Sequence, residues 1–284
     1  MDAFWYWWQH LPQHIDPVIF KIGSFRLQYY GLMYLVGFAI TYMLALYRLK
    51  TEKRWDFFTV EHLQGLITAM IIGLILGARL GYVIFYKPAY YAAHPLEIIL
   101  PFQFKNGFQF TGISGMSYHG GLIGAFTGLV YYTRKYKLGI RNGADLLAPC
   151  GALGYTFGRI GNFLNGELWG RETTAPIGMY FYGAGGDSLR HPSQLYEAFG
   201  EGILLFVVLW LLRRRLRTPG TTFCVYLIGY GTARFVIEFF RQPDAHLGFV
   251  FLKFSMGQVL CSIMITVGII AFFLSKRTAS SSKA

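Results

Sequence analysis

The sequence has few charged side chains. Only 14% of its 284 residues are Asp, Glu, Lys or Arg, against about a quarter in ordinary soluble domains. Hydrophobic residues make up 54%, and the mean hydropathy is +0.39. This composition excludes a disordered chain and argues against a water-solvated globule. Several apolar stretches reach the length that spans roughly 30 Å of hydrocarbon, so we predict a polytopic membrane protein.

Cysteine is scarce as well. Cys150, Cys224 and Cys261 each lie in an apolar stretch, which excludes a disulfide scaffold and predicts packed thiols. The first residues lack a basic region and a small-residue cleavage site, so a cleaved signal peptide is not expected. Their crowded aromatic side chains instead predict that residues 1–27 form an arm in the interface on the outer side of the membrane.

Acidic residues are outnumbered, 14 to 26, which gives a formal net charge of +12. Fifteen of the basic residues lie in four short clusters, at 48–54, 134–141, 213–217 and 276–283. Each cluster follows an apolar stretch, which is the positive-inside pattern of cytoplasmic loops and also suits contact with anionic lipid. A nucleic-acid groove would need basic residues gathered on one folded face, so no nucleic-acid partner is expected.

The apolar windows between these clusters predict seven transmembrane helices in an all-α protein. They lie near 28–47, 61–86, 116–133, 144–163, 195–212, 222–241 and 255–274. Basic loops follow the odd-numbered spans, which places the N-terminus outside and the C-terminus in the cytoplasm.

The predicted domains follow from these spans. The arm 1–27 precedes a seven-helix catalytic domain, 28–274, which includes the outer loops 87–115 and 164–194. A cytoplasmic tail, 275–284, ends in the Ser-rich stretch 279–284, which we expect to be disordered. Glycines spaced by four along the second span, and by three or four along the fourth, predict close helix packing. The alternative is that they leave room for a lipid headgroup.

Polar side chains inside the spans share one depth. The second, fourth and sixth spans run outward, which places Arg79, Arg159 and Arg234 roughly 6–11 Å below their outer ends. The other members of this layer are Tyr30, His119, Asn162, Glu167 and Glu238. Charged groups cost about 2.5–3.5 kcal/mol each in a membrane span, so they need partners or a function. The pattern predicts one site open to the outer leaflet.

Most members also have a structural explanation. Arg234 and Glu238 are spaced i, i+4 and could neutralise each other. Arg79 could extend to the interface, and Tyr30 could belong to an aromatic belt. His119, before two glycines, could be a satisfied core histidine or a functional one.

Arg159 with Asn162 and Glu167 is the stronger functional candidate. A guanidinium near the lipid-phosphate layer suits bidentate contact with a phosphodiester. The sequence has no His-Glu-x-x-His pattern, and neither Ser114 nor Ser117 lies in a nucleophile elbow. The residues alone therefore favour an anionic phospholipid site, without a metal or cofactor, that assists attack on the lipid.

Several segments carry a family resemblance. The most specific is the stretch GRIGNFLNGELWGR at 158–171. With it, in the family's order, come YHGGLIG at 118–124, HPSQLYE at 191–197, and the segments 16–20, 29–34 and 230–244. Over roughly 16–274 the chain resembles the prolipoprotein diacylglyceryl transferase family.

The resemblance implies a bacterial inner-membrane, multi-pass transferase with its N-terminus and active site toward the periplasm. Such an enzyme moves the sn-1,2-diacylglyceryl group of phosphatidylglycerol to the lipobox cysteine of a prolipoprotein signal peptide. A thioether forms and sn-glycerol 1-phosphate leaves, in the first step of lipoprotein maturation, without a cofactor. The attacking sulfur belongs to the substrate, so the absence of a nucleophile is explained. We expect the chain to act as a monomer in membrane lipid.

Roles follow as hypotheses. His119 is the candidate acceptor of the thiol proton, or a positioning group, and Arg159 and Arg234 are the candidate catalytic cations for the phosphate. The expected substrate-binding residues are Arg159, Asn162, Glu167, Tyr30, Glu238 and Gly170. A transporter or lipid flippase would instead gather charges at the midplane, often in two related halves. A retinal-type receptor is disfavoured because 255–274 contains no Lys.

Overall fold

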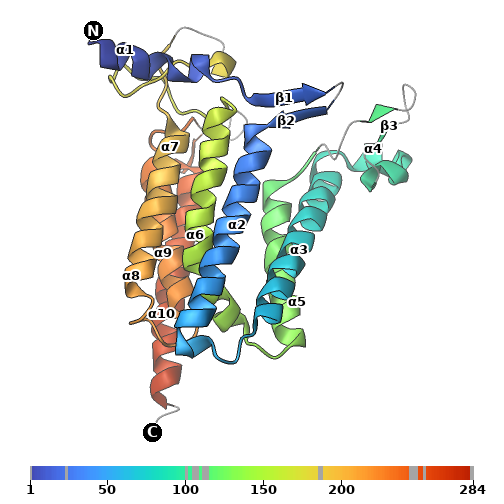
Figure 1. Cartoon of the computed structure of the whole chain (residues 1–284), viewed down its shortest axis with the longest axis vertical. Helices are drawn as coiled ribbons and strands as arrows, with labels where there is room; N and C mark the ends of the chain where they lie inside the picture. The colour runs from blue at the N-terminus through green and yellow to red at the C-terminus, as the bar shows by residue number, and fades with distance from the viewer. Residues whose placement is uncertain are drawn as a thin grey trace. The chain divides into compact units, whose positions relative to one another are not determined.

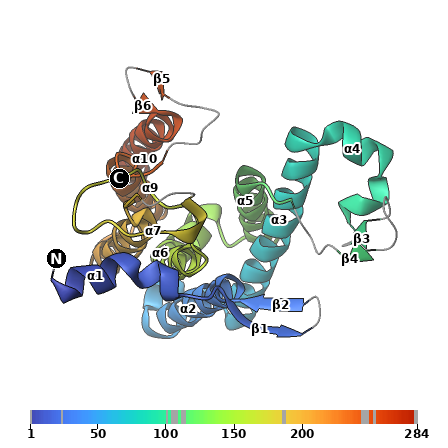
Figure 2. The same ribbon diagram turned by 90° about the horizontal axis from the view of Figure 1, so that it is seen from above.

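The structure is a computed structural model, and it describes residues 2–22, 25–99, 102–103, 109–110, 115–184, 188–242, 249–251 and 254–281. The chain divides into two compact units. The first unit comprises Met1–Arg48 and Ala144–Ala284, and the second comprises Leu49–Gly143. Figures 1 and 2 label the helices and strands of both units.

Helices are present at all seven predicted ranges. They are α2 (Tyr29–Thr51), α3 (Val60–Tyr86), α5 (Tyr118–Lys135), α6 (Ile140–Leu164), the continuous run of α7 (Ser193–Glu197), η5 (Ala198–Leu204) and α8 (Leu205–Leu212), then α9 (Thr221–Ile237) and α10 (Met256–Ser281). Among the residues that the structure describes, four helices are long and apolar enough to cross a membrane, namely Tyr29–Thr51, Val60–Tyr86, Ser193–Leu212 and Met256–Thr278. The structure is thus that of a mostly helical polytopic membrane protein. The seven-span topology stays a prediction.

Four helix boundaries differ from the prediction by four residues or more. α2 continues to Thr51, four residues beyond its predicted end. α6 begins four residues early, at Ile140, and contains Pro149. α9 ends at Ile237, because the following residues turn tightly and the Phe240 amide donates to the Ile237 carbonyl at 2.9 Å. α10 continues to Ser281, so the expected disorder is wrong for 279–281, and 282–284 lie outside the described residues. A run of Ser and Thr lowers hydropathy but does not by itself end a helix.

In the first unit, α6 lies between α2 and α7 in both views (Figures 1 and 2). The contact with α2 is close because it is made by glycine. A Cβ atom on Gly37 would lie 2.7 Å from the Gly154 carbonyl oxygen. The Thr41 hydroxyl donates to the Gly37 carbonyl at 2.8 Å, and also to the Cys150 carbonyl at 3.3 Å. All three cysteines are buried thiols, as predicted.

A buried polar contact joins the second turn of α6 to the first turn of α9. The Asp145 carboxylate accepts hydrogen bonds from the Gly220 and Phe223 amides, both at 2.8 Å. Arg48 is buried beside it and donates to the carbonyls of Asp145 and Leu146. Asp145 therefore satisfies amides that the first turn of a helix leaves without partners.

The N-terminal arm consists of α1 (Ala3–His10), η1 (Leu11–His14) and an unpredicted hairpin of β1 (Val18–Ile22) and β2 (Phe25–Gln28). The Trp8 indole donates to the Ile177 carbonyl at 3.0 Å, and the Tyr180 amide donates to the Gln9 carbonyl at 2.8 Å. The arm is thus fixed to the loop 164–194. The aromatic side chains of Phe4, Tyr6 and Trp7 remain exposed.

The second unit is centred on α3 and α5. A Cβ on Gly124 would lie 1.9 Å from the Gly73 carbonyl oxygen, and one on Gly77 would lie 2.3 Å from the Gly120 carbonyl oxygen. These distances confirm the predicted close packing, because each Cβ position is already occupied by backbone of the facing helix.

The loop 87–115 of this unit contains α4 (Pro88–Ala93) and η3 (Pro95–Ile98). The Arg79 guanidinium donates to the Ile98 carbonyl at 2.8 Å, to the Glu97 carbonyl, and to the Gly115 carbonyl at 3.3 Å. Arg79 therefore holds this loop and does not extend freely to the interface. The remaining strands are β3 (Phe102–Gln103), β4 (Gln109–Phe110), β5 (Phe249–Phe251) and β6 (Phe254–Ser255).

Candidate active site

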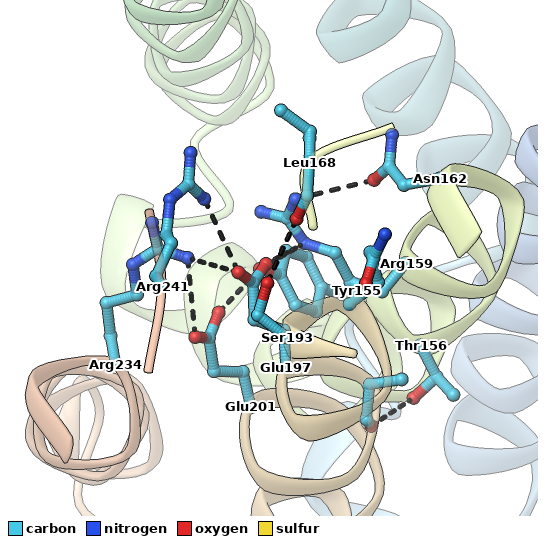
Figure 3. Close-up of polar contacts among 12 residues, drawn as sticks. Tyr155, Thr156, Arg159, Asn162, Leu168, Ser193, Glu197, Glu201, Arg234 and Arg241 are labelled. Carbon is cyan, nitrogen blue, oxygen red and sulfur yellow. Dashed lines mark hydrogen bonds and ion pairs between the residues drawn. The ribbon is translucent and has the colours of Figure 1, made fainter. Parts of the chain in front are cut away.

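A cluster of buried charges lies where α6, α7, η5 and α9 of the first unit meet (Figure 3). Each helix contributes two polar side chains one turn apart, so that both lie on the same helix face. These are Tyr155 and Arg159 on α6, Glu197 and Glu201 at the end of α7 and in η5, and Arg234 with Glu238 at the end of α9.

Glu197 is at the centre of the cluster and is fully buried. Its Oε2 lies 2.7 Å from Arg159 Nε, and its Oε1 lies 3.2 Å from Arg234 Nη1. The same Oε1 lies 3.4 Å from Nη1 of Arg241, which follows α9. One carboxylate therefore contacts three guanidinium groups, as Figure 3 shows. A buried ion is tolerated only when it is paired in this way.

Two further carboxylates complete the ion pairs. Glu201 Oε1 lies 3.6 Å from Arg234 Nη1, and Glu201 Oε2 accepts a hydrogen bond from the Tyr155 hydroxyl. That hydroxyl in turn accepts from Arg159 Nε at 2.6 Å. Glu238 lies 3.3 Å from Arg234 Nη2, which confirms the pair expected from the i, i+4 spacing. Three arginines thus face three glutamates.

The predicted neighbours of Arg159 are near it. Arg159 Nη1 donates to Asn162 Oδ1 at 3.4 Å, and Asn162 Nδ2 donates to Glu167 Oε1 at 2.8 Å. Gln194 fixes the loop by donating to the Glu167 carbonyl at 2.6 Å. Tyr30 lies at the start of α2, and its hydroxyl donates to the Tyr34 hydroxyl at 3.1 Å. Within the described ranges, Arg159 Nη2 donates no hydrogen bond.

Gly170 lies between two backbone segments of the first unit. Its amide donates to the His191 carbonyl at 2.8 Å, and a Cβ there would lie 2.4 Å from the Phe240 carbonyl oxygen. The Arg171 amide donates to that carbonyl at 2.9 Å. This close approach requires a glycine, and a role of Gly170 in substrate binding stays a prediction.

His119 belongs to the second unit, where it is the second residue of α5. Its side chain is exposed, and its ring lies 5.6 Å from that of Tyr118. Over the part of the chain that the structure describes, the His119 ring makes no hydrogen bond. His119 is therefore not a buried core histidine with satisfied hydrogen bonds. Its part in proton transfer stays a prediction.

Sequence reasoning missed four members of the cluster, which are Tyr155, Glu197, Glu201 and Arg241. A signal was available for two of them, because Glu197 and Glu201 are carboxylates inside the predicted span 195–212. The helix that carries them widens to a π-helix at Ala198–Leu204. Such widened turns are frequent at functional sites, but the sequence pattern does not predict them.

The arrangement suits recognition of a phosphate group. The side chains of Arg159, Arg234 and Arg241 are 13–16% exposed, while the carboxylates that hold them are almost fully buried. A guanidinium fixed on one side can offer its remaining N–H groups to phosphate oxygens. The same donors can stabilise negative charge that develops on a leaving phosphate.

Several known proteins are similar to this chain over nearly its whole length. The family model described as prolipoprotein diacylglyceryl transferase matches residues 17–274. A Chlorobaculum tepidum protein named phosphatidylglycerol–prolipoprotein diacylglyceryl transferase is 51% identical over 98% of this chain and 96% of its own length. Proteins of the same name are similar: that of Bordetella parapertussis is 44% identical (95% and 98% covered), and that of Geobacter sulfurreducens is 43% identical (93% and 97% covered). The chain therefore belongs to the prolipoprotein diacylglyceryl transferase family and is a transferase.

Proposed function

We propose that this chain transfers the sn-1,2-diacylglyceryl group of phosphatidylglycerol to the lipobox cysteine of a prolipoprotein signal peptide. The bond between the glyceryl C3 carbon and the phosphate oxygen breaks, and a C–S thioether bond forms. The phosphate leaves on sn-glycerol 1-phosphate, and the thiol proton passes to a base. The observation that carries the proposal is the convergence of Arg159 and Arg234 on the buried Glu197.

Arg159 and Arg234 bind the phosphodiester and offset the charge that grows on the leaving group. Glu238, 3.3 Å from Arg234 Nη2, keeps that guanidinium oriented. Asn162 and Glu167, joined at 2.8 Å, hold the headgroup hydroxyls beside Arg159. Tyr30 donates a hydrogen bond at the rim of the site. Gly170 lets the loop carrying Glu167 pass close to the end of α9.

The thiol needs help to react. A free cysteine has a pKa of about 8.5, and an apolar site raises it, so a base near the sulfur increases the reactive thiolate. We assign to His119 the role of accepting the thiol proton, because its ring is exposed and its nitrogens are open to a substrate. Substituting His119 by Gln should slow thiol attack more than it weakens lipid binding. Equal loss of both would contradict the assignment.

Both substrates reach the site from the bilayer of the bacterial inner membrane. In the proposed topology all seven helices cross, the N-terminus and the site face the periplasm, and a monomer is sufficient. The support is the distribution of basic residues, because the clusters at 48–54, 134–141 and 213–217 lie at the ends of α2, α5 and α8. The signal peptide presents its cysteine as part of a membrane-spanning helix.

The proposal is tested with purified protein in detergent, phosphatidylglycerol and a synthetic lipobox peptide. The wild-type protein should yield both the diacylglyceryl-peptide and glycerol phosphate. Arg159→Ala should lower turnover about 100-fold or more, which is the usual cost of removing one charge-stabilising donor. Arg214→Ala, in the exposed basic cluster after α8, is the matched control and should transfer normally.

Normal turnover by Arg159→Ala would overturn the phosphate assignment. A folded wild-type protein that binds phosphatidylglycerol and gives neither product would favour lipid transport over transfer.

A further inference from the structure

The three arginines of the cluster reach Glu197 from different parts of the fold. Arg159 comes from α6, Arg234 comes from α9, and Arg241 follows the turn after α9. Each of the other two carboxylates has an ion pair with Arg234. Glu197 is therefore the point at which α6 and the end of α9 are connected through charge.

We infer that Glu197 is a positioning residue that fixes the spacing of the guanidiniums of Arg159, Arg234 and Arg241. The inference deepens the proposed function and rests on it, because it gives Glu197 a role in that same site. Glu197 is fully buried, so it acts through the arginines and does not itself contact the substrate.

The charge of Glu197 is needed because like charges repel. Three guanidiniums that each lie within 3.4 Å of one carboxylate are close to one another, and their low exposure limits screening by water. Removing the negative charge would let the arginines separate while leaving their positive charges in the site. An anionic lipid would then still be attracted, but its phosphate would be held in the wrong place.

The backbone under Glu197 is also held in place. The next residue, Ala198, is buried, and its carbonyl accepts a hydrogen bond from the Thr156 hydroxyl of α6 at 3.4 Å. A Cβ on Gly202, one turn later, would lie 2.1 Å from the same Thr156 oxygen. The carboxylate therefore extends from a segment that is packed tightly against the helix carrying Arg159. Such rigid support is what a positioning group requires.

A merely structural carboxylate would give a different kinetic result. If Glu197 only offset buried charge, its loss would lower the amount and thermal stability of folded protein, and the folded fraction would turn over normally. A positioning residue instead changes kcat, because productive geometry is lost while binding is kept.

The test is a steady-state assay of full-length protein with phosphatidylglycerol and the lipobox peptide. Glu197→Gln keeps the side-chain volume and removes the charge. Its kcat should fall about 100-fold, the usual cost of misplacing a reacting group by an ångström. The KM for phosphatidylglycerol should change less than about threefold. Glu172→Gln is the matched control, because Glu172 is exposed and pairs with Arg190 outside the cluster, and it should match the wild type.

Glu197→Asp tests the position of the carboxylate separately from its charge. The same variant tests the inference if Glu197→Gln does not fold. It keeps the negative charge but withdraws the carboxylate by one methylene. We expect a folded protein with kcat lowered about tenfold or more and an unchanged KM. Wild-type kcat in Glu197→Asp, or a raised KM with normal kcat in either variant, would overturn the inference about Glu197. The proposed transferase function would be unaffected by that result. A wild-type protein that makes no modified peptide would overturn the proposed function, and the inference with it.

Discussion

At the scale of single residues, buried carboxylates neutralise the arginines of the site. Arg159 and Arg234 each contact Glu197, and Arg234 also contacts Glu201 and Glu238. Side chains held in this way lose little further freedom when a ligand binds, which is the advantage of a preorganised site. The cost is a set of buried ions that must all be paired.

Tyr155 offers a test of this network at the residue scale. Its hydroxyl accepts from Arg159 Nε at 2.6 Å and donates to Glu201. Tyr155→Phe removes the hydroxyl that donates to the buried Glu201 carboxylate, so the free energy of unfolding should fall by about 1–3 kcal/mol. The loss in kcat should stay below about tenfold, because the contact of Arg159 with Glu197 at 2.7 Å remains.

Thermal unfolding of the purified protein in detergent measures the first effect, and the transfer assay measures the second. Tyr182→Phe is the control, because Tyr182 is 81% exposed in the outer loop. A Tyr155→Phe variant as stable as this control would mean that the hydroxyl bridge contributes nothing.

Local sequence spacing predicted part of the site and missed its centre. Arg159, Asn162 and Glu167 are near in the chain, and Arg234 with Glu238 share a helix face, so their contacts follow from helix geometry. Glu197 meets Arg159 only because α7 packs beside α6, and this packing is tertiary. The two glutamates in an apolar span could have been noticed, since buried carboxylates need partners. Their particular partners could not have been predicted.

At the scale of helices and strands, glycine sets the closest approaches. In the second unit, α3 and α5 meet backbone to backbone, and in the first unit α2 and α6 do the same at Gly37 and Gly154. The hydropathy of the spans predicted these helices because long apolar runs dominate the sequence. The β1–β2 hairpin and the π-helix at Ala198–Leu204 carried no comparable signal, since each depends on local hydrogen bonding within a few residues.

Gly124 tests the helix packing. Its Cβ would lie 1.9 Å from the Gly73 carbonyl oxygen and 2.7 Å from the carbonyl carbon, and backbone atoms cannot rotate away. Gly124→Val should therefore lower the free energy of unfolding by about 1–3 kcal/mol or more. The readout is the thermal midpoint of the purified protein.

Gly151→Ala is the control on another helix, because among the described residues no atom beyond its chain neighbours and the local helix backbone lies within 4 Å of the added Cβ. It should leave stability unchanged or raise it by up to about 1 kcal/mol. A Gly124→Val midpoint equal to that of this control would contradict the close contact of α3 and α5.

At the scale of the whole molecule, three independent features agree. The composition and four long apolar helices indicate a membrane protein, the family match covers residues 17–274, and the buried charges of the first unit suit a phosphate. The basic clusters fall near the ends of alternate helices, which is the pattern that the proposed topology requires. Composition and hydropathy predicted the membrane protein and its helices, because the membrane constrains whole segments more than single contacts. The topology that the charge pattern favours stays a prediction.

The central claim is that a complete diacylglyceryl group moves to sulfur. The most direct measurement is the mass of the lipobox peptide after incubation with phosphatidylglycerol of known acyl chains, followed by hydroxylamine treatment. The account predicts a gain of the whole diacylglyceryl mass on cysteine, resistance of the thioether to hydroxylamine, and one glycerol phosphate released per modified peptide. A gain of a single acyl chain that hydroxylamine removes would reveal a thioester, and would contradict the account.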